Sequence, residues 1–288
     1  MRSFDSVEYA RLGDALLEMV REAGDAILEV YRRDDLGVAS KADDSPVTEA
    51  DLAAHRVLVR ALEALEPRLP VLSEEGEQFD GPTRAGWEAC WIVDPLDGTR
   101  EFVNRNDEFT VNVALIENGR PTLGVVGVPA RGQAYLGRVA DGLAEEVDYA
   151  AGTSREIRCR PCPEAPLVMA SRSHRSAALE GLLGDLKGSF PGLEEREAGS
   201  ALKLVEIARG VCDEAQAVRA WSMRALEAVG SLVPDGCLRT LALASGAGTH
   251  VAHPARVAAT NTLAALHGAG ALGQGRAALR FDRLDREG

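Results

Sequence analysis

The segment at residues 94–99, Asp-Pro-Leu-Asp-Gly-Thr, places two carboxylates three positions apart, directly after the apolar stretch Trp91-Ile92-Val93. Two such carboxylates are costly to bury together unless a cation compensates their charge. Gly98 permits close approach of the backbone to a ligand, and a helix that starts at Thr99 would offer free N–H groups to a phosphate oxygen. Oxygen ligands beside a phosphate are typical of a Mg²⁺ site. An Asp-capped surface turn is the alternative interpretation, and the complete hexapeptide disfavours it.

A second short apolar stretch, residues 70–73, also ends in acids, Glu74 and Glu75. Two strands that both terminate in carboxylates predict a site at the strand ends. The pattern Thr48-Glu-Ala-Asp51 fits a capping box at the start of a helix. Asp51 therefore has two possible roles, which are the capping of this helix and participation in the same acidic site.

The elements that must position these acids follow from hydrophobic spacing and turn signals. Apolar residues three and four apart predict a helix over about residues 7–32, and a second helix is expected from Thr48 through Leu65. Asn118-Gly119 predicts a hairpin. Further strands are expected at residues 110–116, 122–128, 134–139 and 167–170, and further helices at 177–186 and 201–209. The alternation predicts a layered α/β fold, with residues 1–150 carrying the metal site and residues 151–288 completing the substrate site.

Composition excludes several classes of function. The 288 residues carry a formal net charge of −13, which argues against nucleic-acid binding because phosphate backbones require a Lys/Arg excess. No apolar run is long enough for an integral membrane segment, and the N-terminal residues lack the features of a signal peptide. We expect a cytoplasmic protein, with peripheral association with the inner membrane left open. Cys159 and Cys162 are interpreted as reduced thiols rather than as a zinc or redox site.

Residues 72–75 and 94–99 together resemble the first signature of the lithium-sensitive, Mg²⁺-dependent phosphatases of the inositol monophosphatase superfamily. Further segments are similar to its CysQ branch of 3′(2′),5′-bisphosphate nucleotidases: residues 41–51, 98–102, 106–112, 171–174 and 199–203. The resemblance covers about residues 7–210. It implies an αβαβα sandwich of the sugar-phosphatase type, two or three Mg²⁺ ions, inhibition by Li⁺, and removal of the 3′-phosphate of adenosine 3′,5′-bisphosphate. A monomer and a homodimer are both compatible with it.

The resemblance also implies roles for individual residues. The metal ligands would be Glu74, Asp94, Asp97, the carbonyl of Leu96, and Asp51, which would bind a further metal or its water. Thr99 would help to orient the attacking water, and Gly98 would lie against the substrate. The nucleotide and its 5′-phosphate would be held by His174, Ser200 and Lys203. Since cations neutralise the phosphate and activate the water, in-line attack needs no covalent intermediate.

The C-terminal part departs from the family pattern. Ser222 follows Trp221 where the family has a metal-ligating Asp, and the 46 residues between Asp235 and Asp282 contain no Asp or Glu. A neutral hydroxyl is a weak Mg²⁺ ligand, so we expect a high Mg²⁺ requirement; residues 211–288 are either divergent or frame-shifted. Three functions stay open: a bisphosphate nucleotidase, a broader inositol or sugar monophosphatase, and a catalytically impaired relative that binds nucleotide or metal.

Overall fold

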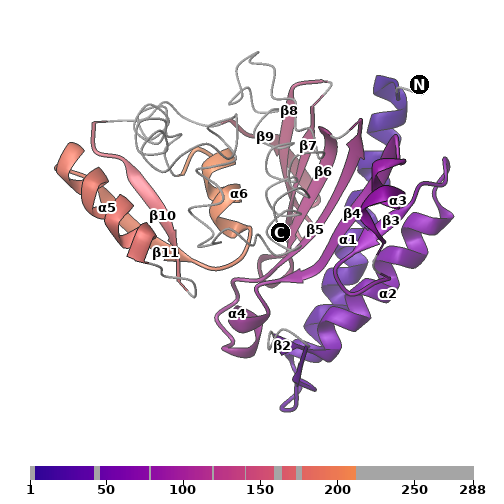
Figure 1. The fold of residues 1–288 in the computed structure, drawn as a ribbon, viewed down its shortest axis with the longest axis horizontal. Helices are drawn as coiled ribbons and strands as arrows, with labels where there is room; N and C mark the ends of the chain where they lie inside the picture. Colours follow the sequence, from indigo (N-terminus) through magenta and orange to yellow (C-terminus); the bar gives the residue numbers. More distant parts are fainter. Residues whose placement is uncertain are drawn as a thin grey trace.

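A seven-stranded sheet with the strand order β3-β4-β5-β6-β7-β8-β9 forms the centre of the fold (Figure 1). The computed structural model describes residues 4–41, 46–77, 79–118, 120–139, 141–158, 164–172 and 177–211. β3 pairs with β4 in parallel, and every later neighbouring pair is antiparallel. The strands are β3 (Val71–Ser73), β4 (Ala89–Asp97), β5 (Thr110–Glu117), β6 (Arg120–Val128), β7 (Gln133–Arg138), β8 (Leu143–Asp148) and β9 (Thr153–Glu156).

Two long helices, α1 (Ser6–Tyr31) and α2 (Glu49–Ala64), cover one face of this sheet (Figure 1). Each begins at a capping box, with Asp5 as the N-cap of α1 and Thr48 as the N-cap of α2, so the first N–H groups of both helices are partnered. The buried side of α1 packs against β5, β6 and β7. A Cβ added at Gly127 would lie 2.4 Å from Cγ1 of Val20, so the missing side chain allows α1 to approach the sheet closely.

The other face of the sheet is covered by α6 (Leu202–Ala208), whose apolar side chains Leu202 and Val205 pack with Val126 and Tyr135 of the sheet. Beyond α6 lie the parallel pair β10 (Leu167–Ser171) and β11 (Glu194–Ala198) and then α5 (Ala177–Ser189) (Figure 1). The order of layers is therefore helix, two-stranded sheet, helix, seven-stranded sheet, helix pair. This arrangement confirms the predicted αβαβα sandwich.

Most of the elements predicted from the sequence are present. The five predicted helices correspond to α1, α2, α4 (Thr99–Val103), α5 and α6. The predicted hairpin is the β5–β6 pair, although Gly119 lies outside the described residues. The sequence did not predict β8, β9 or β11. The shorter elements are β1 (Ala39–Ser40), β2 (Pro46–Val47), α3 (Gly81–Ala85), α4 (Thr99–Val103) and the 3₁₀ turn η1 (Pro129–Arg131).

The division into residues 1–150 and 151–288 stays a prediction.

Among the residues that the structure describes, no helix is both long enough and apolar enough to cross a membrane.

Candidate metal and phosphate site

Glu74 and Asp94 start from neighbouring positions in the sheet. Ser73 pairs in parallel register with Val93, so Glu74, which follows β3, lies beside Asp94 of β4. The sequence predicted that the second strand ends before Asp94, but β4 continues to Asp97 and Asp94 pairs with Asn112 of β5. The backbone N–H of Glu74 donates to the carbonyl of Val93 at 3.1 Å, which extends the pairing by one residue. The parallel pair thus brings the two carboxylates together, as the sequence predicted from the apolar stretches that precede them.

Asp94 is fully buried, at 0% exposure. Neither of its carboxylate oxygens has a hydrogen-bond partner of ordinary geometry among the described residues. Burial raises the pKa of Asp94 well above its usual range, and the nearby charges of Glu74 and Asp97 raise it further. A buried carboxylate without a partner is costly, so this position calls for either a proton or a cation.

Asp97 leaves the sheet at an irregularity in the β4–β5 pairing, where the register shifts between Asp94 and Asp97. Its Oδ2 accepts a hydrogen bond of 2.6 Å from the backbone N–H of Ala201. The next residue, Gly98, has a φ of 93°, and a Cβ there would lie 3.1 Å from the carbonyl oxygen of Glu108. Glycine is therefore required for the turn that carries Asp97 into α4.

Asp51 is part of the cap of α2, and it also lies beside other residues of the predicted site. It is 2% exposed, and its Oδ2 accepts from the backbone N–H of Thr48 at 2.8 Å and from the Thr48 hydroxyl at 2.7 Å. Its Oδ1 accepts from the Thr99 hydroxyl at 3.2 Å, and the same hydroxyl lies 3.4 Å from the carbonyl oxygen of Leu96. The helix cap therefore holds Asp51 against two other residues of the predicted site.

Lys41 and Glu75 are members of the site that sequence reasoning did not single out. The ammonium of Lys41 donates to Oε1 of Glu74 at 2.8 Å and also contacts Glu75. Burial opposes the charge on Lys41, but the hydrogen bonds and charges of the two glutamates prevail and raise its pKa. Two features of the sequence could have drawn attention to these residues. Lys41 is the first residue of the segment 41–51, which resembles the CysQ branch, and Glu75 directly follows Glu74.

The turn before α6 lies against the acidic site. A Cβ at Gly98 would also be 3.1 Å from Cβ of Ser200, a residue with a φ of 48°. Lys203 is 6% exposed, and its ammonium donates to the carbonyls of Ser200 at 2.7 Å and Ala198 at 3.3 Å. Burial lowers the pKa of Lys203, while the charges of Asp97, Glu101 and Glu108 oppose that shift.

Two of the residues predicted to hold the nucleotide, Ser200 and Lys203, are thus beside the predicted metal ligands. Their role stays a prediction, because the Lys203 ammonium is directed to backbone carbonyls in this structure. His174 and Ser222 lie outside the described residues, as do Cys159, Cys162 and the acid-free stretch.

The chemistry of the donor set fits a hard divalent cation. Carboxylate and carbonyl oxygens are the ligands that Mg²⁺ prefers, and the buried oxygens of Asp94 have no hydrogen-bond partner of ordinary geometry among the described residues. Within the described ranges, no three His, Cys, Asp or Glu side chains are already arranged around one metal position. Instead, Glu74 is held by Lys41 and Asp97 by the amide of Ala201. In this structure Glu74 and Asp97 therefore have protein groups as hydrogen-bond partners in place of a metal.

These carboxylates predict how the stability of the metal-free protein depends on pH. Burial is the largest cause that raises the pKa of Asp51, Glu74, Asp94 and Asp97. Above the ordinary carboxyl pKa of about 4, the folded protein then binds more protons than the unfolded chain. The free energy of unfolding is expected to fall as the pH rises from about 4 through the raised values.

Urea unfolding in chelator at a series of pH values measures this fall, and added Mg²⁺ is expected to remove most of it. The variant Asp94→Asn is the matched control, because it deletes one of the contributing groups and should flatten the curve. A metal-free protein that gains stability over the same pH range would contradict the prediction.

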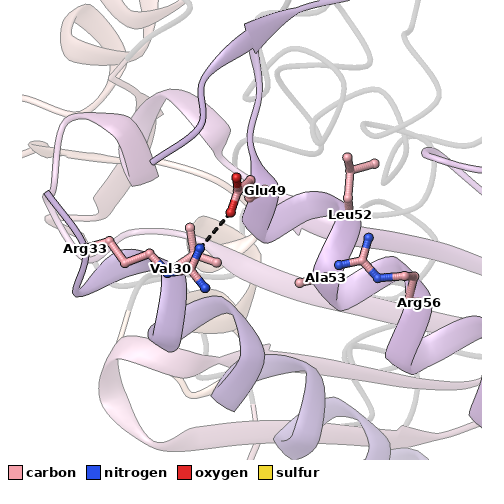
Figure 2. A pocket seen from close by; sticks show the side chains of 6 residues that line it. All are labelled: Val30, Arg33, Glu49, Leu52, Ala53 and Arg56. Carbon is pink, nitrogen blue, oxygen red and sulfur yellow. Dashed lines mark hydrogen bonds and ion pairs between the residues drawn. The ribbon is translucent and has the colours of Figure 1, made fainter. Parts of the chain in front are cut away.

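A separate pocket of about 250 Å³ lies between the end of α1 and the start of α2 (Figure 2). It is lined by Val30, Arg33, Glu49, Leu52, Ala53 and Arg56. Arg33 and Glu49 form an ion pair of 2.6 Å across it. None of the predicted site residues lines this pocket, so it is distinct from the acidic site.

Comparisons with known proteins agree with this arrangement. Residues 9–228 match the model of the Inositol monophosphatase family. The 3′(2′),5′-bisphosphate nucleotidase CysQ of Escherichia coli strain K12 is 44% identical over 201 residues, which cover 68% of this chain and 76% of that protein.

Solved structures show the same relationship. The structure of CysQ from Bacteroides thetaiotaomicron, a bacterial member of the inositol monophosphatase family, has a TM-score of 0.63 at 34% identity and covers 72% of this chain and 80% of that one. The extragenic suppressor protein suhB from Bartonella henselae has a TM-score of 0.59 at 25% identity, over 70% of this chain and 76% of that one. The extent of the family match and the identity to CysQ confirm the resemblance seen in the sequence motifs. The chain therefore belongs to the inositol monophosphatase family.

Proposed function

We propose that this protein is a Mg²⁺-dependent 3′(2′),5′-bisphosphate nucleotidase, which hydrolyses the 3′-phosphate of adenosine 3′,5′-bisphosphate to give AMP and phosphate. The observation that carries the proposal is the buried, unpartnered carboxylate of Asp94 beside Glu74 and Asp97. The substrate class is taken from the Escherichia coli relative, which is a 3′(2′),5′-bisphosphate nucleotidase, CysQ.

The metal would be held by carboxylates at the strand ends and by one carbonyl. In this proposal two or three Mg²⁺ ions are bound by Glu74, Asp94, Asp97, the carbonyl of Leu96, and Asp51. When bound, Mg²⁺ neutralises the phosphomonoester dianion and lowers the pKa of a bound water. The proposal is supported by the closeness of Asp94 to Glu74 and Asp97, while Glu74 and Asp97 would exchange their present hydrogen bonds for the metal.

The attacking water would be oriented by the pair of Thr99 and Asp51. The Thr99 hydroxyl donates to Asp51 at 3.2 Å, while the capping hydrogen bonds from Thr48 fix the Asp51 carboxylate. In this arrangement the water would donate to the Thr99 hydroxyl oxygen. Thr99 would pass its own hydroxyl proton to Asp51 as it takes one from the water, so the proton would end on the Asp51 carboxylate.

Substrate would bind beside the turn at Gly98 and the turn that contains Ser200. These two turns are in contact, since an added Cβ at Gly98 would be 3.1 Å from the Ser200 side chain. In this proposal Gly98 lies against the substrate through its backbone, and its missing side chain makes room for the Ser200 turn. In this proposal Ser200, Lys203 and His174 hold the nucleotide and its 5′-phosphate.

A phosphate-release assay with adenosine 3′,5′-bisphosphate and inositol 1-phosphate side by side tests the proposal. We expect a higher kcat/KM for the bisphosphate, complete loss of activity with chelator, and inhibition by Li⁺. A preference for inositol phosphate would instead assign the broader monophosphatase function. Binding of Mg²⁺ and nucleotide without any turnover would assign the impaired relative.

The Ser222 position gives a separate prediction about metal requirement. Replacing a full negative charge by a neutral hydroxyl weakens Mg²⁺ binding, so the wild type is expected to need an abnormally high Mg²⁺ concentration. If residues 211–288 are divergent and Trp221 starts a helix that faces Glu74, Ser222→Asp is expected to lower the half-saturating Mg²⁺ concentration in the phosphate-release assay, and Ser222→Ala is the matched control that should leave it unchanged. If these residues are instead frame-shifted, Ser222→Asp should have no effect. Full activity of the wild type at sub-millimolar Mg²⁺ would show that another group, such as Asp213 or Glu214, supplies the ligand.

A further inference from the structure

His55 lies one helical turn after Asp51 on α2, so the two side chains project from the same side of this helix. Its ring Nδ1 is 2.8 Å from the hydroxyl oxygen of Ser73. Ser73 is the last residue of β3 and is 2% exposed. The hydrogen bond therefore joins the helix that carries Asp51 to the strand that delivers Glu74.

The imidazole also contacts the far end of the turn that carries the two glutamates. This turn runs from Ser73 to Gly76 and is closed by a hydrogen bond of 3.1 Å from the Gly76 N–H to the Ser73 carbonyl. A Cβ at Gly76 would lie 3.3 Å from Cε1 of His55, so the ring edge occupies the space beside that glycine. His55 thus touches both ends of a four-residue turn whose middle residues are Glu74 and Glu75.

The burial of His55 favours a neutral ring. Burial and the neighbouring Arg56 lower the pKa of His55, against the opposing charge of Glu75. A neutral imidazole can form a hydrogen bond with a hydroxyl through Nδ1 in either tautomer, so the contact with Ser73 does not depend on a fixed charge.

We propose that His55 is a positioning residue of the metal site, which acts through Ser73 to hold the 73–76 turn so that Glu74 is presented together with Asp51 and Asp94. This inference rests on the proposed metal-dependent function and adds a residue to it. His55 touches neither substrate nor metal ligand atoms in this role. Its effect is on the placement of Glu74, because a ligand must be held in position before it can bind a metal tightly.

The test measures Mg²⁺ affinity directly, by isothermal titration calorimetry on the full chain. His55→Phe keeps a ring against Gly76 but removes the hydrogen bond, and Ser73→Ala removes the bond from the other side. Each is expected to weaken Mg²⁺ binding by about tenfold, the lower end of the loss seen for groups that orient metal ligands. The double variant should be no weaker than either single one, since both remove the same interaction.

A conservative variant separates positioning from packing. His55→Asn places an amide atom close to the position of Nδ1 and can donate or accept, so it should restore Mg²⁺ affinity to within about threefold of the wild type. At saturating Mg²⁺, His55→Phe should recover a kcat near that of the wild type, because only metal affinity is affected. Arg60→Ala, an exposed change on the same helix, should alter neither quantity.

The outcomes distinguish this inference from the proposed function. If Glu74→Gln weakens Mg²⁺ binding but His55→Phe and Ser73→Ala do not, whatever their effect on thermal stability, the inference is overturned while the metal site stands. If Glu74→Gln binds Mg²⁺ as the wild type does, the metal assignment itself is wrong and the inference falls with it. Should His55→Phe fail to fold, Ser73→Ala carries the same expectation with a smaller change in packing.

Discussion

Replacing Asp94 with asparagine is expected to lower kcat for phosphate release by at least about 100-fold, the scale of losing a main electrostatic stabiliser. Asparagine is nearly the same size, so the substitution removes the charge and leaves the shape of the site. The carboxylate is fully buried and lacks a hydrogen-bond partner of ordinary geometry among the described residues, so metal is its expected source of compensation. Steady-state kinetics over a range of Mg²⁺ concentrations measure the loss.

The same variant should behave differently in the metal-free state. Because burial and the neighbouring acids raise the pKa of Asp94, its ionised form destabilises the fold at neutral pH, and Asp94→Asn should be at least as stable as the wild type in chelator. Asp185→Asn, an exposed change on α5, should leave both kinetics and stability unchanged. Full activity of Asp94→Asn would remove Asp94 from the metal site.

Replacing Lys203 with alanine is expected to reduce the free energy of unfolding by about 3–5 kcal/mol, the scale of leaving buried charges without their counter-charge. The ammonium is buried, offsets the charges of Asp97, Glu101 and Glu108, and donates to two carbonyls of the turn before α6. Its loss should disturb Asp97 and the turn, which lowers activity toward both substrates. Adenosine bisphosphate should lose more than inositol phosphate, because Lys203 is also proposed to hold the 5′-phosphate. Urea unfolding in chelator gives the stability change.

A surface lysine provides the matched control for this prediction. Lys187 pairs with Glu195 at 2.7 Å, but its side chain is 53% exposed, and exposed pairs contribute about 0–1 kcal/mol. Lys187→Ala should therefore have little effect. Unchanged stability of Lys203→Ala would contradict its role as a buried counter-charge, and an equal loss of activity on both substrates would contradict its role as a nucleotide ligand.

The sequence predicted the acidic centre because its signals are local. An apolar stretch followed by carboxylates locates Glu74 at the end of β3 and Asp94 on β4, although β4 continues past Asp94 to Asp97. The capping box at Thr48 fixes Asp51 at the start of a helix. Long amphipathic helices such as α1 are likewise specified by spacing alone. These features need no knowledge of which residues meet in space.

The features that the sequence did not predict depend on distant contacts or on exposed strands. Lys41 reaches Glu74 across 33 positions, and the amide of Ala201 reaches Asp97 across 104, so neither contact has a local signature. All four residues of β9 are exposed, so this strand has no apolar alternation by which to be recognised. β11 is mostly charged and exposed, so the sequence did not predict it for the same reason.

The hydrogen bond between Asp97 and the amide of Ala201 has a thermodynamic consequence. One carboxylate belongs both to the acidic centre and to the turn that starts α6, so ion occupancy and the conformation of that turn are linked equilibria. Linkage is reciprocal. If the bound ion raises the affinity of the turn for a ligand by a given factor, the bound ligand must raise the affinity of the site for the ion by the same factor. The affinity for the ion should therefore depend on whether the organic ligand is bound, and the affinity for the organic ligand on whether the ion is bound. This dependence would be lost if solvent, rather than the amide of Ala201, were the hydrogen-bond partner of Asp97.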